Sequence, residues 1–180
     1  QRRLLGFHHA KKTVAPAAEH GGASAAASAA APTAGGAGGA GGSASAPQVA
    51  SRLHAEALWR LGYTGKGVRV AVFDTGLGRD LPQLPNVEER TNWTDEEDSD
   101  DKVGHGTFVA SVIGSRSGCR GLAPDATLHI FKVFNSKQVS YTSWFLDAFD
   151  YALRARVHVL NLSIGGPDFA DRPFMRKVRT

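Results

Sequence analysis

Two short segments of the chain carry residue types that could act together as an acid and a base. The first, residues 70–76 (V-A-V-F-D-T-G), places Asp74 after an apolar run, and the second, residues 104–107 (G-H-G-T), contains His105. A buried Asp that accepts the Nδ1 proton of a His fixes the tautomer and leaves the other ring nitrogen free to act as a general base. The sequence therefore predicts a proton-transfer site, provided that the fold brings the two segments together.

The elements around these residues indicate how they could meet. Residues 68–73 are typical of a strand buried on both faces of a parallel sheet, which places Asp74 at the strand's carboxyl end. Ligand chemistry in open α/β sheets gathers at that edge. A helix is predicted from His105 onward, and we expect it to begin at the same edge and to bring His105 beside Asp74. Its apolar positions are Phe108, Val109, Val112 and Ile113, and its small residues are Gly106, Ala110 and Gly114.

These motifs resemble those of a known protease family. V-A-V-F-D-T-G and G-H-G-T-F-V-A are similar to the Asp and His segments of the subtilases, the subtilisin-like serine proteases, whose triad runs in the chain order Asp, His, Ser. The resemblance covers roughly residues 48–180 and points to a membrane-bound branch of the family in the Golgi. It implies an α/β fold, a subtilisin-like parallel sheet with helices on both faces, which is truncated here. The further matching stretches are residues 62–65, 89–94, 138–149 and 159–169.

The resemblance also implies a function. Asp74 and His105 are expected to be catalytic residues of a serine endopeptidase in the secretory pathway, at the Golgi membrane, with protein substrates that include membrane-bound precursors. Cleavage is expected after Arg-x-x-Leu-like sequences. The family's nucleophile lies in a Gly-Thr-Ser motif, which does not occur in this sequence. We therefore expect the serine to lie outside the chain and the chain by itself to be inactive.

The head of the chain resembles a cleavage site of the same kind. In Arg2-Arg3-Leu4-Leu5, Arg2 stands four residues before a cut after Leu5, so Arg2, Leu4 and Leu5 are candidate autoprocessing residues of the protein's own prosegment. A solvated basic tail is the alternative interpretation. The chain begins with Gln1, so we expect a fragment or a processed product. It contains no run of about eighteen apolar residues, so we expect any membrane anchor to lie outside it.

Substrate-binding residues are expected in two places. Ser163, Ile164 and Gly165 end a predicted strand and resemble the subtilase segment that lines the substrate cleft, where main-chain pairing holds an extended peptide. Residues 95–101 hold six carboxylates in seven positions. From this run we expect Asp100 and Asp101 to help select Arg in substrates, because a carboxylate can pair with a guanidinium in a fork geometry. A solvated loop is the alternative.

No metal site is predicted. The acidic run lacks a spaced ligand pattern, although many subtilases bind calcium, so calcium is the one cofactor left open. Asn92 begins an Asn-Trp-Thr sequon for N-glycosylation. Asn161 begins a second sequon, which we set aside because it falls in a strand expected to be buried. Cys119 is the only cysteine, and in an oxidising compartment an odd thiol suggests a partner elsewhere.

Other functions fit the same residues less well. Asp-Thr-Gly at residues 74–76 is also a signature of aspartic proteases, but these need a second such loop or a dimer that supplies it, and no second Asp-Thr-Gly or Asp-Ser-Gly occurs in this sequence. A core Asp and a core His of an unrelated α/β domain would leave two motif matches unexplained. A non-catalytic relative that only binds peptides stays open, because the nucleophile is not in the sequence.

Composition divides the chain unevenly. Of residues 21–46, 24 are Ala, Gly or Ser, so residues 1–47 are interpreted as a prosegment end or linker, largely disordered, and residues 48–180 as the N-terminal part of a subtilase catalytic domain. The net charge is +4, but residues 51–180 hold 17 Lys and Arg against 16 Asp and Glu. Nucleic-acid binding is therefore unsupported.

Hydrophobic spacing predicts the remaining elements. We expect a helix over residues 48–61, a strand over 127–134, a helix over 140–153 and a buried strand over 157–162.

Overall fold

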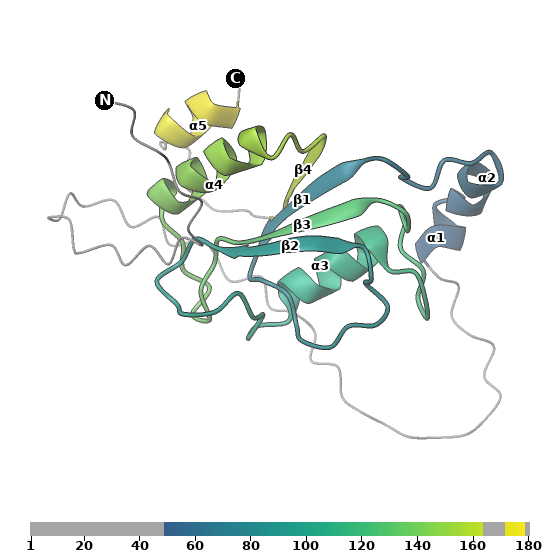
Figure 1. The fold of residues 1–180 in the computed structure, drawn as a ribbon, viewed down its shortest axis with the longest axis horizontal. Helices are drawn as coiled ribbons and strands as arrows, with labels where there is room; N and C mark the ends of the chain where they lie inside the picture. The colour runs from purple at the N-terminus through teal and green to yellow at the C-terminus, as the bar shows by residue number, and fades with distance from the viewer. Residues whose placement is uncertain (1–48, 164–171, 179–180) are drawn as a thin grey trace, which may run out of the picture.

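The structured part of the chain is an α/β fold. The computed structural model describes residues 49–163 and 172–178, and these form a four-stranded parallel sheet in the order β2-β3-β1-β4, with helices on both faces (Figure 1). The predicted fold class is thereby confirmed. The strands are β1 (Arg69–Asp74), β2 (Val87–Asn92), β3 (Thr127–Lys132) and β4 (Val159–Leu162); the helices are α1 (Val49–Arg52), α2 (Ala55–Arg60), α3 (His105–Gly114), α4 (Thr142–Arg154) and α5 (Arg172–Val178).

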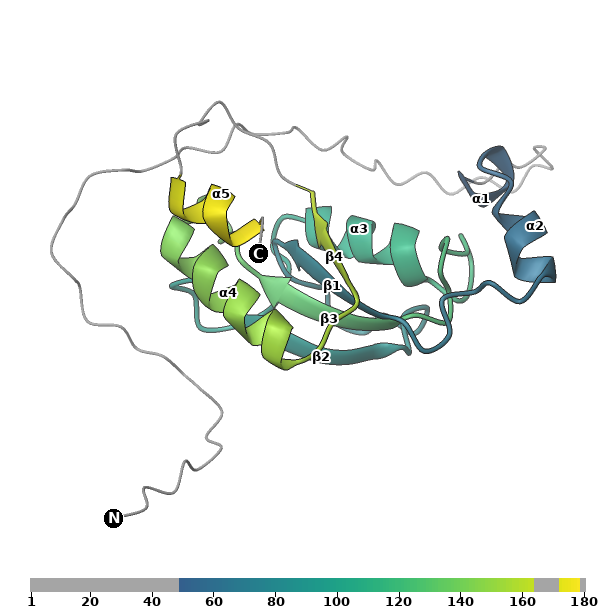
Figure 2. The ribbon, with the colours of Figure 1, turned by 90° about the horizontal axis from the view of Figure 1, so that it is seen from above.

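The two faces of the sheet follow from the alternation of side chains along each strand. In β1, Val70 and Val72 point to the face covered by α3, whereas Ala71 and Phe73 point to the face covered by α4. Figure 2 shows the two helices on opposite sides of the sheet, with α5 beside α4. Because the period is two, the next residue after Phe73 is turned back toward α3. That residue is Asp74.

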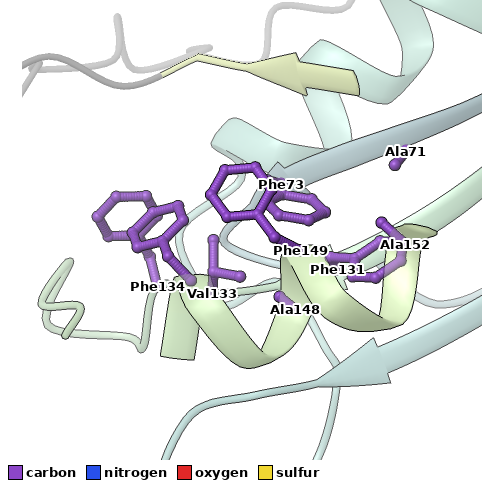
Figure 3. Packing of buried hydrophobic residues seen from close by; sticks show 9 residues of the cluster. Ala71, Phe73, Phe131, Val133, Phe134, Ala148, Phe149 and Ala152 are labelled. Carbon is purple, nitrogen blue, oxygen red and sulfur yellow. The ribbon is translucent and has the colours of Figure 1, made fainter. Parts of the chain in front are cut away.

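Aromatic packing dominates the face covered by α4. The ring of Phe73 lies 4.6 Å from that of Phe131 and 5.1 Å from that of Phe149, measured between centroids. Ala148 and Ala152 are fully or almost fully buried, which lets α4 lie close to the sheet. Figure 3 shows this cluster between the sheet and α4. The packing fixes the middle strands, and with them the position of their carboxyl ends.

Polar contacts tie β2, β3 and α4 together near the same core. His129 in β3 is buried, and its Nδ1 lies 2.9 Å from Oε1 of Glu89 in β2. The hydroxyl of Tyr151 in α4 donates to the other oxygen of Glu89 at 2.8 Å. Burial and this carboxylate raise the pKa of Tyr151. These contacts give His129 a structural place away from Asp74 and His105.

The first predicted helix is broken. In place of one helix over residues 48–61, the described residues from Val49 onward form two short helices, α1 and α2, and His54 between them adopts a left-handed backbone with φ 55°. Leu53, Leu58 and Leu61 are exposed, so the apolar side chains that suggested one continuous helix are not packed against the described sheet. Trp59 contacts the fold outside the sheet, because its Nε1 donates to the carbonyl of Leu122, in the loop between α3 and β3, at 3.0 Å.

The last predicted strand also differs from expectation. β4 is an edge strand of the described sheet, and its residues are exposed or half-buried instead of buried. Val159 is 50% exposed, and Asn161 is only partly buried. Burial therefore gives no reason to set aside the sequon at Asn161. The predicted linker of residues 1–47 lies outside the described residues.

Candidate active site

Asp74 and His105 meet as the sequence predicts. Nδ1 of His105 lies 2.8 Å from Oδ1 and 3.0 Å from Oδ2 of Asp74. Asp74 is 1% exposed, whereas the side chain of His105 is 32% exposed. The opposite ring nitrogen, Nε2, points away from the carboxylate. A buried acceptor on one side and solvent access to the ring give the arrangement of an oriented general base.

Gly106 lets the helix that carries His105 approach the turn after Asp74, and Gly76 lets the acidic run approach the same turn. A Cβ on Gly106 would run into the carbonyl oxygen of Gly76 and would lie 3.2 Å from Cβ of Asp74. Gly76 itself has φ +107°, and a Cβ there would lie 2.5 Å from the carbonyl oxygen of Ser99. Only glycine fits at either position without displacement of the backbone. Gly106 therefore allows the short distance between the His105 helix and Asp74.

Thr75, the residue after Asp74, helps to hold the Asp74 carboxylate in place. The backbone N–H of Thr75 donates to Oδ1 of Asp74 at 2.8 Å. The Thr75 hydroxyl accepts the backbone N–H of Gly106 at 3.0 Å, which ties the turn after β1 to the first turn of α3. Thr75 therefore both holds the acid and anchors the helix of the base.

Asp101 lies at this junction, but in another environment than expected. Its Oδ1 accepts hydrogen bonds from the Thr75 hydroxyl and the N–H groups of Val103 and Gly104, and its Oδ2 accepts both the N–H and the hydroxyl of Thr107. Burial acts to raise the pKa of Asp101, but hydrogen bonds from Thr107, Gly104 and Thr75 outweigh it and lower the pKa. The carboxylate is engaged inside the protein, which leaves little capacity for a substrate guanidinium.

Asp100 also has partners of its own. It forms ion pairs with Arg79, whose side chain is 73% exposed, and with Arg90 at 3.2 Å. The hydrogen bond from Arg79 is the main reason why the pKa of Asp100 is lowered. A substrate Arg would have to compete with Arg79 for this carboxylate. Of the two residues predicted to select Arg, only Asp100 has an exposed partner, Arg79, that a substrate Arg would replace.

Sequence reasoning missed Lys132. Its side chain is fully buried at the end of β3, where Nζ donates to the carbonyls of Thr75 at 2.9 Å and Asp100 at 2.8 Å. Nζ also lies 3.1 Å from Oε2 of Glu96. The acidic run is therefore not simply a solvated loop, because this ammonium binds it to the Asp74 turn. A Lys closing an apolar strand was the available signal, since a buried ammonium needs partners.

The structure describes only some of the other predicted site residues. Ser163 is exposed just after β4, and its hydroxyl donates to Oδ1 of Asn161 at 2.8 Å. Oδ1 of Asn92 accepts the N–H and the hydroxyl of Thr94, within the predicted sequon. The residues that lie outside the described part are Ile164 and Gly165 of the predicted cleft segment and Arg2, Leu4 and Leu5 of the predicted processing site.

Residues 49–163 and 172–178 contain no cluster of three or more His, Cys, Asp or Glu side chains that could hold a metal ion. The same residues contain no helix long and apolar enough to cross a membrane. Cys119 is a free, exposed thiol.

The contacts of Asp74 argue against the aspartic-protease alternative. That chemistry requires two carboxylates that share a proton, whereas the carboxylate of Asp74 pairs with a His. The closest acidic neighbour through hydrogen bonds, Asp101, is separated from it by the Thr75 side chain. The site is therefore that of an acid and a His base.

Comparison with known proteins gives one consistent answer. The chain is 65% identical over 131 residues to the membrane-bound transcription factor site-1 protease of Homo sapiens, which covers 73% of this chain and 12% of that protein. It is 54% identical over 136 residues to a subtilisin-like protease of Arabidopsis thaliana, covering 75% of this chain and 13% of the relative. Subtilisin E of Bacillus subtilis is 36% identical over 128 residues, covering 68% and 33% of the two chains.

The chain therefore spans a small part of the site-1 proteases that it matches. The model of the subtilase family, peptidase S8, matches residues 65–179, which is more than half of the chain and includes both β1 and α3. The chain belongs to the subtilase family.

Proposed function

We propose that the chain supplies the acid and the base of a subtilisin-type serine endopeptidase. The observation that carries this proposal is the contact between Nδ1 of His105 and the buried carboxylate of Asp74, at 2.8 Å. Membership of the subtilase family and 65% identity to a site-1 protease support it. In this role Asp74 holds the imidazole in one tautomer, and Nε2 of His105 accepts the proton of a serine hydroxyl that attacks the scissile carbonyl.

The serine comes from outside the described residues. Ser115, one of the serines that follow a glycine, is buried at the far end of α3, and its hydroxyl donates to the carbonyl of Ser117. A helix of ten residues is about 15 Å long. Ser115 is thus too far from His105 to serve as the nucleophile. The nucleophile and the donors that bind the oxyanion belong to another segment of the enzyme.

The relatives also support a proposal for substrate class and location. We propose cleavage of protein substrates, membrane-bound precursors among them, after Arg-x-x-Leu-like sequences in the secretory pathway, at the Golgi membrane. The similarity to a protease named membrane-bound supports this proposal. In the same scheme residues 1–47 end the prosegment, with cleavage after Leu5, and residues 48–180 begin the catalytic domain. Ser163, Ile164 and Gly165 would pair with the extended substrate, and Asn92 would carry a glycan.

The proposal is tested in a chimera. Residues 49–178 replace the matching segment of the human site-1 protease, so that the rest of the enzyme supplies the serine. We expect the chimera to cleave an Arg-x-x-Leu peptide and to react with serine-directed fluorophosphonates. Inhibition by a transition-state mimic of aspartic proteases, with no fluorophosphonate reaction, would contradict the mechanism. Peptide binding without cleavage would favour the non-catalytic alternative.

A further inference from the structure

The carboxylate of Asp101 collects hydrogen bonds from both segments of the acid–base pair. Five donors lie between 2.6 and 3.1 Å from its two oxygens. One is the hydroxyl of Thr75, which directly follows Asp74, and two belong to Thr107, two residues after His105. The N-cap of α3, Gly104, has no side chain, so Asp101 takes the place of a cap and accepts the N–H of Thr107 in the first turn.

Thr75 and Thr107 form a reciprocal cross-connection above this carboxylate. The Thr75 hydroxyl accepts the N–H of Gly106 from α3, and the Thr107 hydroxyl accepts the N–H of Gly78 from the loop after β1, at 3.0 and 2.9 Å. Each hydroxyl has one proton to donate, and the nearest acceptor for each is Asp101, at 2.8 and 2.6 Å. The carboxylate is therefore the common acceptor of two hydrogen-bond chains that join the two segments.

The direction of the Thr75 proton matters for the acid itself. A second acceptor lies near this hydroxyl, namely Oδ1 of Asp74, at 3.3 Å. That oxygen is the one that Nδ1 of His105 contacts at 2.8 Å. When the Thr75 hydroxyl donates its proton to Oδ1 of Asp101, 2.8 Å away, Oδ1 of Asp74 accepts hydrogen bonds, within the described part of the chain, from His105 and from the backbone N–H of Thr75 only.

We propose that Asp101 is a positioning residue that joins the His105 helix to the Asp74 turn and keeps the Thr75 hydroxyl away from the acid. This inference rests on the proposed protease function and adds to it a residue that touches neither substrate nor nucleophile. It also replaces the expectation that Asp101 selects Arg in substrates.

The substitution Asp101→Asn is the sharpest probe, because it keeps the shape of the side chain and changes its hydrogen-bonding pattern. All five partners of Asp101 donate, so the amide nitrogen that the substitution introduces would meet donors wherever it points. Glu97→Gln is the matched control, because Glu97 is an exposed carboxylate of the same loop and the change in charge is identical. Thr75→Val is a milder variant that removes one chain only.

The first measurement is hydrogen exchange by mass spectrometry on the chimera, which does not depend on activity. Asp101→Asn should speed the exchange of the amides that the cluster holds, in peptides covering residues 103–107, by about tenfold or more. Peptides covering β3, residues 127–132, should exchange as in the wild type, and Glu97→Gln should change neither region. If residues 103–107 keep their protection in Asp101→Asn, the inference is overturned.

The second measurement is steady-state kinetics on the same proteins. A misplaced base lowers kcat by about 100-fold while KM stays within about twofold, since the substrate contacts are intact. Thr75→Val combined with Asp101→Asn should lose less than the product of the single losses, because both act through one chain. Faster exchange with an unchanged kcat would refute positioning. A wild-type chimera that cleaves nothing would refute the protease function, and the exchange result would still decide whether Asp101 joins the two segments.

Discussion

Three carboxylates that lie near the end of β1 have different partners. Asp74 contacts a histidine, Asp100 pairs with two arginines, and Asp101 accepts five uncharged donors. The sequence indicated the first, because its motif combines Asp with a strand end and a distant Gly-His-Gly. It could not separate Asp100 from Asp101, since adjacent residues of one loop point in different directions that only the folded chain defines.

At the residue scale, we expect Asp74→Asn and His105→Ala in the chimera to lower kcat by about four orders of magnitude. Asn cannot hold the imidazole in the required tautomer, and Ala removes the base. Turnover of an Arg-x-x-Leu peptide measures the loss, and His129→Gln is the control because His129 lies with Glu89 outside the site. Activity retained in His105→Ala would rule out the proposed mechanism.

Asp100 allows a separate prediction about specificity. In Asp100→Asn we expect a loss of kcat/KM for a peptide with Arg four residues before the cut, and no change for its Ala counterpart. Water and salt screen an exposed ion pair, which limits the effect to roughly a few-fold. Arg79→Ala should increase the preference for Arg, because Arg79 then no longer competes for Asp100. An equal ratio in all variants would mean that Asp100 only binds Arg79 and Arg90.

At the element scale, the site depends on how closely α3 crosses β1. The row of small residues in α3 was predicted from spacing, and Gly106, Ala110 and Gly114 are indeed buried. Side chains along a strand alternate between its two faces, and in β1 this alternation turns Asp74 toward α3. The exposure of Phe108, at 66%, was not readable, because periodicity shows which residues share a face and not whether another element covers it.

Gly106→Ala tests this crossing. The added Cβ would run into the carbonyl of Gly76, so α3 must shift away from the Asp74 turn. We expect a loss of about 1–3 kcal/mol in the free energy of unfolding of the 180-residue chain, measured with urea, together with a large loss of activity in the chimera. Gly78→Ala is the matched control, because its nearest atom would lie 3.5 Å away, an ordinary contact. Equal stability of the two variants would show that the approach is not tight.

Lys132 belongs to the same scale, because it ties β3 to the acidic run. Burial acts to raise the pKa of Glu96, but hydrogen bonds from Ser136 and Lys132 lower it from 4.5 to about 2. A depressed pKa means that this group stabilises the fold above about pH 4.5, and that the stabilisation is lost as the pH falls toward 2. Sequence alone could not reveal this ion pair, since Lys132 and Glu96 lie in separate segments of the chain.

We therefore expect Lys132→Met to destabilise the chain by about 3–5 kcal/mol near neutral pH, because it leaves buried acceptors without a cation. The difference from the wild type should shrink as the pH is lowered through the range in which Glu96 becomes protonated. Urea unfolding at neutral pH and near pH 2 measures both. Lys102→Met is the control, since Lys102 is 48% exposed and lies 3.7 Å from the same carboxylate. A pH-independent difference would show that Glu96 is not the relevant partner.

At the scale of the whole molecule, buried runs that alternate with helical spacing predicted a parallel sheet with helices on both faces, but they predicted neither the order of the strands nor a strand at β2. The departures lie at the periphery. The break at His54 and the exposure of β4 both concern segments whose apolar side chains are not covered by the described residues. Local pattern fixes the type of an element, but its ends and its burial depend on neighbours that the pattern does not contain.

The described residues hold only part of the catalytic machinery of a serine protease. Among the described residues, no serine hydroxyl hydrogen-bonds to His105, and the whole sequence lacks the Gly-Thr-Ser motif. The 180-residue chain by itself should therefore not cleave an Arg-x-x-Leu peptide, although its Asp74–His105 pair is in place. A fluorophosphonate should label the chimera and leave the chain unlabelled, and the chimera with its own serine changed to Ala is the control. Labelling of the chain with turnover would place the nucleophile within these residues, because general-base activation requires the serine within hydrogen-bond reach of His105.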